Sequence, residues 1–335
     1  MDYFLLEQLS KICGVSGCED RVSEFIFHQI KQNSDEIYKD AVGNLIVFKK
    51  GYGENKKKIM CISHMDEVGI CVTQVLSNGL IEFKRFGHIS PSSLHMNKIE
   101  FQNGIIGIIT TKSNCDESKP VETENLLIDI GTTSKEATEQ YVKIGDTATF
   151  SSSYVKQNDI IITKALDDRL GCFILIELIS LTRSYNDIYY VFSTQEEIGL
   201  IGSTVVSERI RADLGICVDT VNTYCESSLK IGEGVAIKLS DQCTIFDRDL
   251  VELMKGCANK NNIKYQLEVM SFGGTDAHSL KTSNMGVKVG GISIPIKYGH
   301  SSNSIVNIKD ISVCIDLLKV FLDQEFKFCN FEKIK

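Results

Sequence analysis

The stretch "DIYYVFSTQEEIGLIGS" (residues 187–203) runs from an apolar segment through two adjacent glutamates into a glycine-containing segment. Isoleucine, valine and aromatic residues in a short run are typical of a buried strand, and the polar residues that follow mark its arrival at the surface. Two like charges side by side repel each other unless a positive charge compensates them. The stretch therefore indicates a strand whose end carries a charged site.

The composition favours a globular protein without a polyanionic partner. The chain has 335 residues, 43% of them apolar, which is enough for one large domain with an insertion or for two ordinary domains. Its net charge is −8, and no concentrated basic stretch occurs beyond "KKK" at 56–58, so binding to nucleic acid or an anionic membrane is not expected.

The N-terminus and the cysteines suggest where the protein resides. "MDYFLLEQLSKIC" lacks the basic and apolar regions of a secretory signal, and the longest apolar run, "GCFILIELISL", is short and contains Glu177. None of the twelve cysteines forms a CxxC pair, and Cys61, Cys172, Cys217 and Cys314 lie in apolar runs. We therefore expect a soluble protein of the reducing cytoplasm.

The pattern of elements changes twice along the chain. Residues 1–66 contain helix-like periodicity and a strand, residues 67–162 contain short strand-like runs separated by turns, and residues 163–335 alternate helices with strands. Alternation of this kind favours a sheet with helices on both faces. Because neither α/β part has enough strands to stand alone, we predict one three-layer α/β/α domain (1–66 and 163–335) interrupted by a β-rich insertion (67–162).

Potential metal ligands follow the predicted strands, where open α/β sheets form their binding sites. A lone histidine or aspartate there usually has an ordinary role, in a loop or as a helix cap. Together these residues would place several negative charges in one crevice, which is costly unless cations neutralise them. The residues concerned are His64, Asp66, Glu196, Glu197, Asp219 and His300, with Asp167 and Asp168 at the start of an apolar helix.

The donor types favour two divalent metal ions per subunit. Imidazole and carboxylate groups without a thiolate suit Zn²⁺, Co²⁺ or Mn²⁺, and a pair of ions needs a carboxylate that bridges them. The spacing of "HMD" places Asp66 where it could accept the second imidazole N–H of His64. Neighbouring glutamate side chains diverge, so one of the pair Glu196 and Glu197 could bind metal while the other acts as a general base.

Six motifs in this order resemble the dinuclear metallo-aminopeptidases, a family that includes glutamyl, deblocking and tetrahedral dodecameric aminopeptidases. The similarity extends over nearly the whole chain. It implies a metallopeptidase sheet domain interrupted by a small β-barrel-like dimerisation domain, and a homo-oligomer in which dimers assemble into a dodecamer. The motifs are "CISHMDEVG", "KALDDRLG", "STQEEIGLIGS", "ICVDT", "GGTDA" and "YGHSSNS".

The resemblance also implies a reaction and a role for each residue. The expected reaction is hydrolytic removal of the N-terminal residue from short peptides with a free N-terminus. Asp276 in "GGTDA" is a candidate substrate contact, although a glycine turn leading into a helix explains the motif equally well. The implied roles are His64 and Asp219 as ligands of one metal, Glu197 and His300 as ligands of the other, Asp167 as the bridge, Glu196 as the general base and Asp66 as the carboxylate that orients His64.

The chain departs from the family pattern at two positions near the motifs. His278 follows "GGTDA", where the family usually has a small residue, and Asn303 stands where a glutamate is frequent. These changes concern the shape of the pocket and the tuning of the site, because the ligands themselves are retained. The remaining histidines, His28, His88 and His95, are interpreted as ordinary surface or core residues.

Two other functions compete with the aminopeptidase. Metal carboxypeptidases and N-acyl amino acid amidohydrolases share the H-x-D and Glu-Glu patterns, but their extra domain enters after the ligand that follows the glutamate pair. In this chain the insertion lies between His64 and Asp167. A non-catalytic metal-binding scaffold would have no need of Glu196. Both comparisons favour the aminopeptidase.

Overall fold

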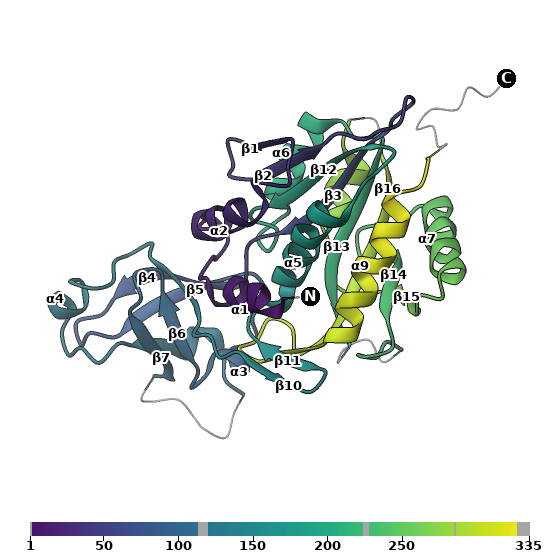
Figure 1. Cartoon of the computed structure of the whole chain (residues 1–335). Helices are drawn as coiled ribbons and strands as arrows, with labels where there is room; N and C mark the ends of the chain where they lie inside the picture. The colour runs from purple at the N-terminus through teal and green to yellow at the C-terminus, as the bar shows by residue number, and fades with distance from the viewer. Residues whose placement is uncertain (1, 113–119, 224–227, 285, 327–335) are drawn as a thin grey trace.

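The computed structural model describes residues 2–112, 120–223, 228–284 and 286–326. Figure 1 shows a large α/β body, here called the sheet domain, and a small β-barrel beside it. Within the described residues, every helix is too short or too polar to span the hydrocarbon core of a membrane.

The sheet domain is built on a large sheet with a parallel centre. Within the described residues the sheet has eleven strands, in the order β1-β2-β12-β3-β13-β16-β17-β11-β10, with β14 attached to β16 and β15 to β14. The parallel strands at the centre are β12 (Asp187–Ser193), β3 (Lys58–His64), β13 (Leu214–Asn222) and β16 (Lys288–Lys297), and β14 and β15 also pair with each other in parallel. The others are β1 (Glu36–Lys39), β2 (Leu45–Lys49), β10 (Val155–Gln157), β11 (Ile160–Thr163), β14 (Val235–Ser240), β15 (Tyr265–Val269) and β17 (Ser304–Asn307).

Helices cover both faces of this sheet. The helix α5 is buried along most of its length because the sheet lies on one side of it and α1 and α9 on the other. Apolar side chains of α2 recur at Val22, Ile26 and Ile30, four residues apart, and form its buried stripe. The helices of the sheet domain are α1 (Tyr3–Lys11), α2 (Asp20–Ile30), α5 (Leu166–Leu181), α6 (Ile201–Ile210), α7 (Arg248–Lys260), α8 (Ala277–Thr282) and α9 (Ile308–Leu322).

Two glycines in the central strands show which face each helix covers. A side chain at Gly215 of β13 would meet Leu280 of α8, whereas one at Gly290 of β16 would meet Met254 of α7. Gly290 pairs with Ile216, the neighbour of Gly215, and successive residues of a strand point to opposite faces. The helices α7 and α8 therefore lie on opposite faces, which gives the three layers predicted from the sequence.

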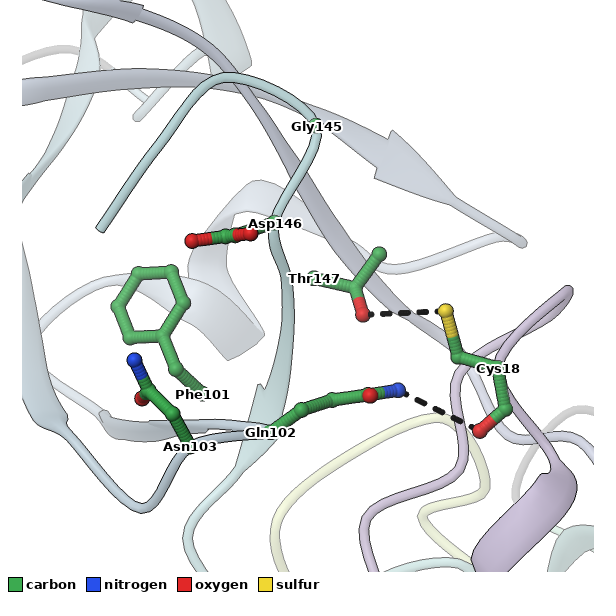
Figure 2. A pocket seen from close by; sticks show the side chains of 7 residues that line it. All are labelled: Cys18, Phe101, Gln102, Asn103, Gly145, Asp146 and Thr147. Atoms are coloured by element: carbon green, nitrogen blue, oxygen red, sulfur yellow. Dashed lines mark hydrogen bonds between the residues drawn. The ribbon is translucent and has the colours of Figure 1, made fainter. Parts of the chain in front are cut away.

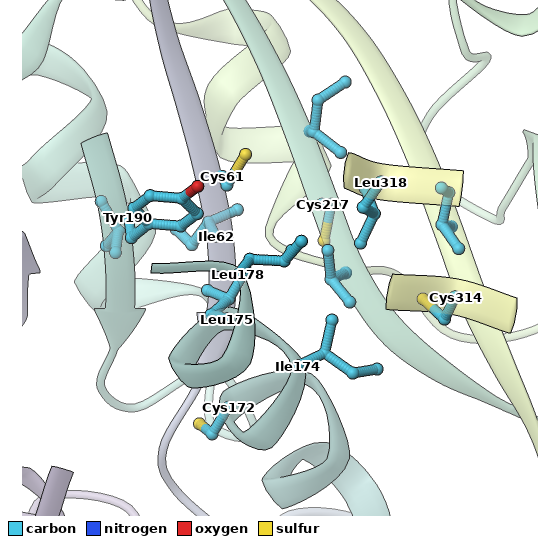
Figure 3. Close-up of a cluster of buried hydrophobic side chains, with 14 of the residues drawn as sticks. Cys61, Ile62, Cys172, Ile174, Leu175, Leu178, Tyr190, Cys217, Cys314 and Leu318 are labelled. Atoms are coloured by element: carbon cyan, nitrogen blue, oxygen red, sulfur yellow. The ribbon is translucent and has the colours of Figure 1, made fainter. Parts of the chain in front are cut away.

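The core of the sheet domain includes free cysteines. Cys61, Cys172, Cys217 and Cys314 are buried free thiols, and Figure 3 shows them among isoleucine, leucine and tyrosine side chains. Burial raises the pKa of Cys172 to about 12, so this thiol stays protonated at neutral pH. The four residues behave as small apolar side chains, as their sequence context predicts.

The barrel is closed, in the strand order β4-β5-β8-β7-β6-β9, and closure leaves no free strand edge. It has its own apolar core, which includes Ile70, Ile81, Ile99 and Phe150. This architecture confirms the predicted fold class. The barrel strands are β4 (Gly69–Val75), β5 (Ile81–Phe86), β6 (Lys98–Phe101), β7 (Ile106–Thr111), β8 (Leu126–Asp129) and β9 (Thr147–Phe150), with short helices α3 (Pro91–Leu94), η1 (Thr123–Asn125) and α4 (Lys135–Thr138).

The predicted insertion covers residues 67–162, but its last part belongs to the large sheet. The strands β10 and β11 form a hairpin, and β11 pairs with β17, so that Thr163 lies opposite Ser304. The chain therefore leaves the barrel after Phe150 and not at residue 162. Strand-like sequence does not reveal which sheet a hairpin joins, because the pairing partner, β17, is distant along the chain.

A buried charge network joins the barrel to the sheet domain. Glu67 lies where the chain enters the barrel, and both of its carboxylate oxygens lie 2.7 Å from Lys164 Nζ. Arg169 of α5 also contacts this carboxylate, and Thr149 of β9 donates a hydrogen bond to it over 2.8 Å. Glu67, Lys164 and Arg169 are all buried. Buried charges need partners of this kind, so the network fixes the two bodies against each other.

Replacement of Lys164 by methionine should destabilise the fold strongly, because it removes the main partner of a buried carboxylate. We expect the free energy of unfolding, measured by urea denaturation, to fall by about 3–5 kcal/mol. The matched change Lys112→Met removes an exposed cation 3.7 Å from Glu82 and should cost less than about 1 kcal/mol. Equal effects of the two changes would contradict this role of the network.

Candidate metal centre

The predicted site residues gather beyond the carboxyl ends of the parallel strands. His64 is the last residue of β3, and Ser193, opposite it in β12, leads into Glu196 and Glu197. His300 lies in the loop after β16. Asp219 differs from the prediction, because β13 continues to Asn222 and Asp219 is therefore inside the strand.

Five of these residues form two groups that share Asp167. One group is His64, Asp167 and Asp219, the other is Asp167, Glu197 and His300, and in each group the potential ligand atoms lie within 4.8 Å of one another. His64 Nε2 lies 3.4 Å from one carboxylate oxygen of Asp167, and His300 Nε2 lies 3.3 Å from the other. Asp167 thus faces one imidazole with each of its oxygens.

The spacing and the hydrogen bonding of this donor set fit divalent cations. Ligand atoms around a tetrahedral Zn²⁺, with bonds of about 2.0–2.1 Å, lie about 3.3 Å apart. Glu197 Oε1 is buried and lies 3.1 Å from His300 Nε2, yet it accepts no hydrogen bond from the described residues. An unsatisfied buried carboxylate oxygen is costly, and a cation between it and the imidazole nitrogen would remove that cost.

The backbone at the start of α5 separates the roles of two adjacent aspartates. Asp167 has extended rather than helical backbone angles (φ −83°, ψ 109°), and its side chain belongs to both ligand groups. Asp168 is buried, accepts hydrogen bonds from Ser63 Oγ and from the backbone N–H of Gly171, and so caps the first turn of the helix. Burial raises the pKa of Asp168 well above its ordinary range.

Asp66 acts through two different groups. His64 Nδ1 lies 3.1 Å from the backbone oxygen of Asp66 and 3.5 Å from its carboxylate, so the backbone oxygen is the closer acceptor. The carboxylate accepts hydrogen bonds from the backbone N–H groups of Glu196 and Glu197 and from Ser16 Oγ. Burial alone would raise the pKa of Asp66, but His64 and these donors hold it below its ordinary value. Asp66 therefore fixes the loop that carries both glutamates.

Glu196 and Asp219 are acids whose ionised forms are disfavoured in the metal-free protein. Burial raises the pKa of Glu196 well above its ordinary value, and Asp276, Glu197 and Asp219 add to the increase. Burial also raises the pKa of Asp219 to about 7, together with the charge of Asp167. Groups perturbed in this way are frequent at catalytic sites.

Asp276 lies at the start of α8 and contacts Ser193, the last residue of β12. Its side chain is buried and accepts a 2.5 Å hydrogen bond from Ser193 Oγ. A substrate contact by Asp276 therefore stays a prediction. Nearby, His278 Nδ1 lies 3.2 Å from the backbone oxygen of Cys243, and Asn303 donates a hydrogen bond to Ser302.

Two residues near the centre had no assigned role in the sequence analysis. The backbone oxygen of His88, in the barrel, lies 2.8 Å from His300 Nδ1. Glu19, at the start of α2, accepts hydrogen bonds from the backbone N–H groups of Gly17 and Gln195. The sequence shows the charge of Glu19, which could have marked it as a candidate. It cannot show the role of His88, because every residue has a backbone oxygen.

A cavity of about 180 Å³ lies apart from the ligand groups, at the junction of the barrel with the loop around Cys18. Figure 2 shows its lining, in which Thr147 Oγ1 donates to Cys18 Sγ over 3.5 Å and Gln102 donates to the Cys18 backbone oxygen. Asp146 supplies the single carboxylate among its lining residues. By contrast, a cavity of about 10 Å³ is lined by Glu67, Asp167 and His300. The ionisable side chains therefore cluster at the strand ends and not in the larger cavity.

Comparison with known proteins identifies the family to which the sequence is similar. The family model for M42 glutamyl aminopeptidases matches residues 43–317. A putative aminopeptidase of Acetivibrio thermocellus is 38% identical over 320 residues, covering 94% of this chain and 96% of that protein. Aminopeptidase APDkam598 from the archaeon Desulfurococcus kamchatkensis has a similar structure, with a TM-score of 0.92, 29% identity and coverage of 96% of this chain and 94% of that chain.

A third similar protein is known to assemble. The TET1 peptidase of Pyrococcus horikoshii has a TM-score of 0.87 and 29% identity, covering 96% of this chain and 99% of that chain. It can form a tetrahedron or a large octahedral shell.

The change Glu19→Gln should alter the pH dependence of stability. Burial raises the pKa of Glu19 from 4.5 to about 7, with a further contribution from Asp66. The folded state therefore binds this proton more tightly, and the wild-type protein loses stability as the pH rises from 4.5 to about 7. Glutamine keeps the acceptor for Gly17 and Gln195 but carries no charge, so the variant should gain about 1–3 kcal/mol relative to wild type over this range.

Urea denaturation in chelator-containing buffer at several pH values across this range measures the difference. The control Glu24→Gln changes an exposed residue of the same helix and should follow the wild-type curve. Parallel curves for Glu19→Gln and wild type would show that Glu19 is not the group responsible.

Proposed function

This chain belongs to the M42 glutamyl aminopeptidase family and is a peptide hydrolase, and from this premise we propose that it removes the N-terminal residue from short peptides at a dinuclear metal centre. The observation that carries the proposal is the position of Asp167, whose two carboxylate oxygens each face a different imidazole. One carboxylate shared by two ligand groups is the arrangement that paired metal ions require.

The two ligand groups support a role for each residue of the centre. His64 and Asp219 hold one ion, Glu197 and His300 hold the other, and Asp167 belongs to both. Imidazole and carboxylate donors suit Zn²⁺, Co²⁺ or Mn²⁺. When bound, such ions lower the pKa of water and stabilise the negative charge that develops on the substrate carbonyl oxygen.

Glu196 is the proposed general base. It is adjacent to the proposed ligand Glu197, and Asp66 holds the backbone N–H groups of both residues, so the backbone that carries the Glu196 side chain is held beside the centre. Glu196 takes a proton from the attacking water, whose oxygen forms the new bond to the carbonyl carbon. It then transfers this proton to the amine nitrogen as the carbon–nitrogen bond breaks.

Assembly and location are further parts of the proposal. We assign dimerisation to the barrel within the predicted insertion, and a dodecamer of such dimers to the full assembly. The similarity to the Pyrococcus horikoshii TET1 peptidase, which forms closed shells, supports this assignment. The buried free thiols support a location in the reducing cytoplasm.

A panel of aminoacyl-p-nitroanilides with Zn²⁺, Co²⁺ or Mn²⁺ tests the reaction class. We expect release of nitroaniline only from compounds with a free α-amine, and only after metal has been added to chelator-treated protein. Hydrolysis of N-acylated amino acids instead would identify the amidohydrolase alternative, and inactivity on both types of substrate would favour a metal-binding scaffold.

The change Glu196→Gln should lower kcat by about 10²- to 10⁴-fold, because the amide cannot accept the proton of the attacking water. The content of bound metal, measured by elemental analysis, should stay as in wild type. Glu197→Gln should instead lower the metal content, and Glu24→Gln, at an exposed site, should change neither quantity. Loss of metal in Glu196→Gln would make this residue a ligand and contradict its role as the base.

A further inference from the structure

The loop that carries His300 does not hold its shape through local interactions alone. Tyr298 and His300 both have positive φ angles, 57° and 58°, which residues with a side chain rarely adopt. Such conformations persist where the surroundings impose them. Within the loop, Ser301 and Ser304 donate hydrogen bonds to the backbone oxygen of Tyr298, but neither contacts the imidazole of His300.

The partner of this imidazole is in the barrel. The backbone oxygen of His88 lies 2.8 Å from His300 Nδ1, although the two residues are 212 positions apart in the chain. Because a carbonyl oxygen only accepts hydrogen bonds, Nδ1 must carry the hydrogen. Nε2, which faces Asp167 and Glu197, then keeps its lone pair for a metal ion when the ring is neutral.

The same turn of the barrel packs against a second ligand. A Cβ atom at Gly87 would lie 3.0 Å from Glu197 Oε2 and 2.6 Å from Val68 Cγ1. Arg85 donates a hydrogen bond to the backbone oxygen of Ile89, whose side chain is buried in the barrel core. Residues 85–89, here called the barrel turn, are thus anchored in the barrel and contact both Glu197 and His300.

A further contact joins the barrel to the His300 loop. Ser302 donates a 3.1 Å hydrogen bond to the side chain of Asn97, which follows α3 of the barrel. The barrel therefore approaches the loop from two separate segments. Displacement of the barrel would change both contacts at once.

Among the described residues, no hydrogen bond joins the barrel to His64 or Asp219 of the other ligand group. His64 Nδ1 faces the backbone oxygen of Asp66, two residues away, and Asp219 belongs to the central strand β13. The orientation of His64 is thus set inside the sheet domain. The two metal sites differ in this respect although they share Asp167.

We propose that the barrel turn is a positioning element for the second metal site, so that the placement of the barrel sets the affinity for the ion held by Glu197 and His300. This inference rests on the proposed dinuclear function and adds a way of regulating it. A change in the barrel alters occupancy of the second site while the first keeps its ligands and their orientation. Interactions of this kind with metal ligands typically change affinity by about 10- to 100-fold.

The test compares two glycines of the barrel that have similar backbone angles. Gly87 has φ 75° and lies against Glu197, whereas Gly104 has φ 87° and would meet no atom within 4 Å of an added Cβ. Gly87→Ala and Gly104→Ala therefore introduce comparable backbone strain, but only the first also places a methyl group against Glu197 and Val68. Chelator-treated protein is titrated with Co²⁺, and calorimetry and the visible Co²⁺ spectrum report the number and affinity of bound ions.

We expect wild type and Gly104→Ala each to bind two ions per subunit, and the affinity for each ion should be the same in the variant as in wild type. Gly87→Ala should bind the first ion as they do and the second about 10- to 100-fold more weakly. Its turnover should recover as the Co²⁺ concentration is raised, which a general defect in folding would not allow.

Arg85→Met provides a second test that adds no atoms near the ligands. It removes the hydrogen bond that closes the barrel turn and should weaken binding of the second ion, with Lys98→Met, an exposed change in the same barrel, as its control. Unchanged second-ion affinity in Arg85→Met and in folded Gly87→Ala would overturn the inference but leave the dinuclear centre intact. Fewer than two ions in the wild type would instead overturn the proposed function itself.

Discussion

The accumulation of buried carboxylates at one edge of the sheet is the constraint on which the site depends. Asp66, Asp168 and Asp276 are almost fully buried there, next to the carboxylates of the two ligand groups. Charges of one sign in a low-dielectric environment repel, which is why burial and neighbouring acids raise the pKa of Glu196. Hydrogen-bond donors satisfy some of these groups, as Ser63 and Gly171 do for Asp168. The carboxylates of the ligand groups converge on two imidazoles and fit divalent cations.

One short segment serves both bodies of the protein. The segment 64–67 begins with a ligand at the end of β3, and its Asp66 holds the backbone of the glutamate loop. The next residue, Glu67, joins Lys164 in the buried network where the chain enters the barrel. Lys164 is three residues before Asp167, so the charge network lies close along the chain to the carboxylate that the two ligand groups share. The junction between the two bodies is therefore part of the support of the proposed metal centre.

The barrel has a closer relation to the chemistry than an insertion on the surface would have. Closure of its strands leaves it without free edges, so it contributes to the site through a turn and not through its sheet. The backbone oxygen of His88 in this turn contacts His300. Gly87 lies close to Glu197, and the turn can approach this side chain because glycine has no side chain of its own. His300, the proposed ligand on a loop with positive φ angles, thus has its imidazole held by a separate body, and this is the basis of the proposed control of the second metal site.

Residue type and periodicity in the sequence determined the layered α/β class, the β-rich insertion and most of the charged residues near the strand ends. That the insertion is barrel-like came from the family resemblance. Residue type alone could not separate Asp167 from Asp168, since both begin the same helix, and only the family resemblance assigned Asp167 as the bridge. In the structure the backbone turns Asp167 toward the ligand groups and Asp168 into the cap. The sequence pattern placed the hairpin β10–β11 in the insertion, because strand-like residues do not name their partner strand. Tertiary structure also decided that backbone oxygens of Asp66 and His88 orient the two imidazoles, since every residue has such an oxygen and only its position in space distinguishes it.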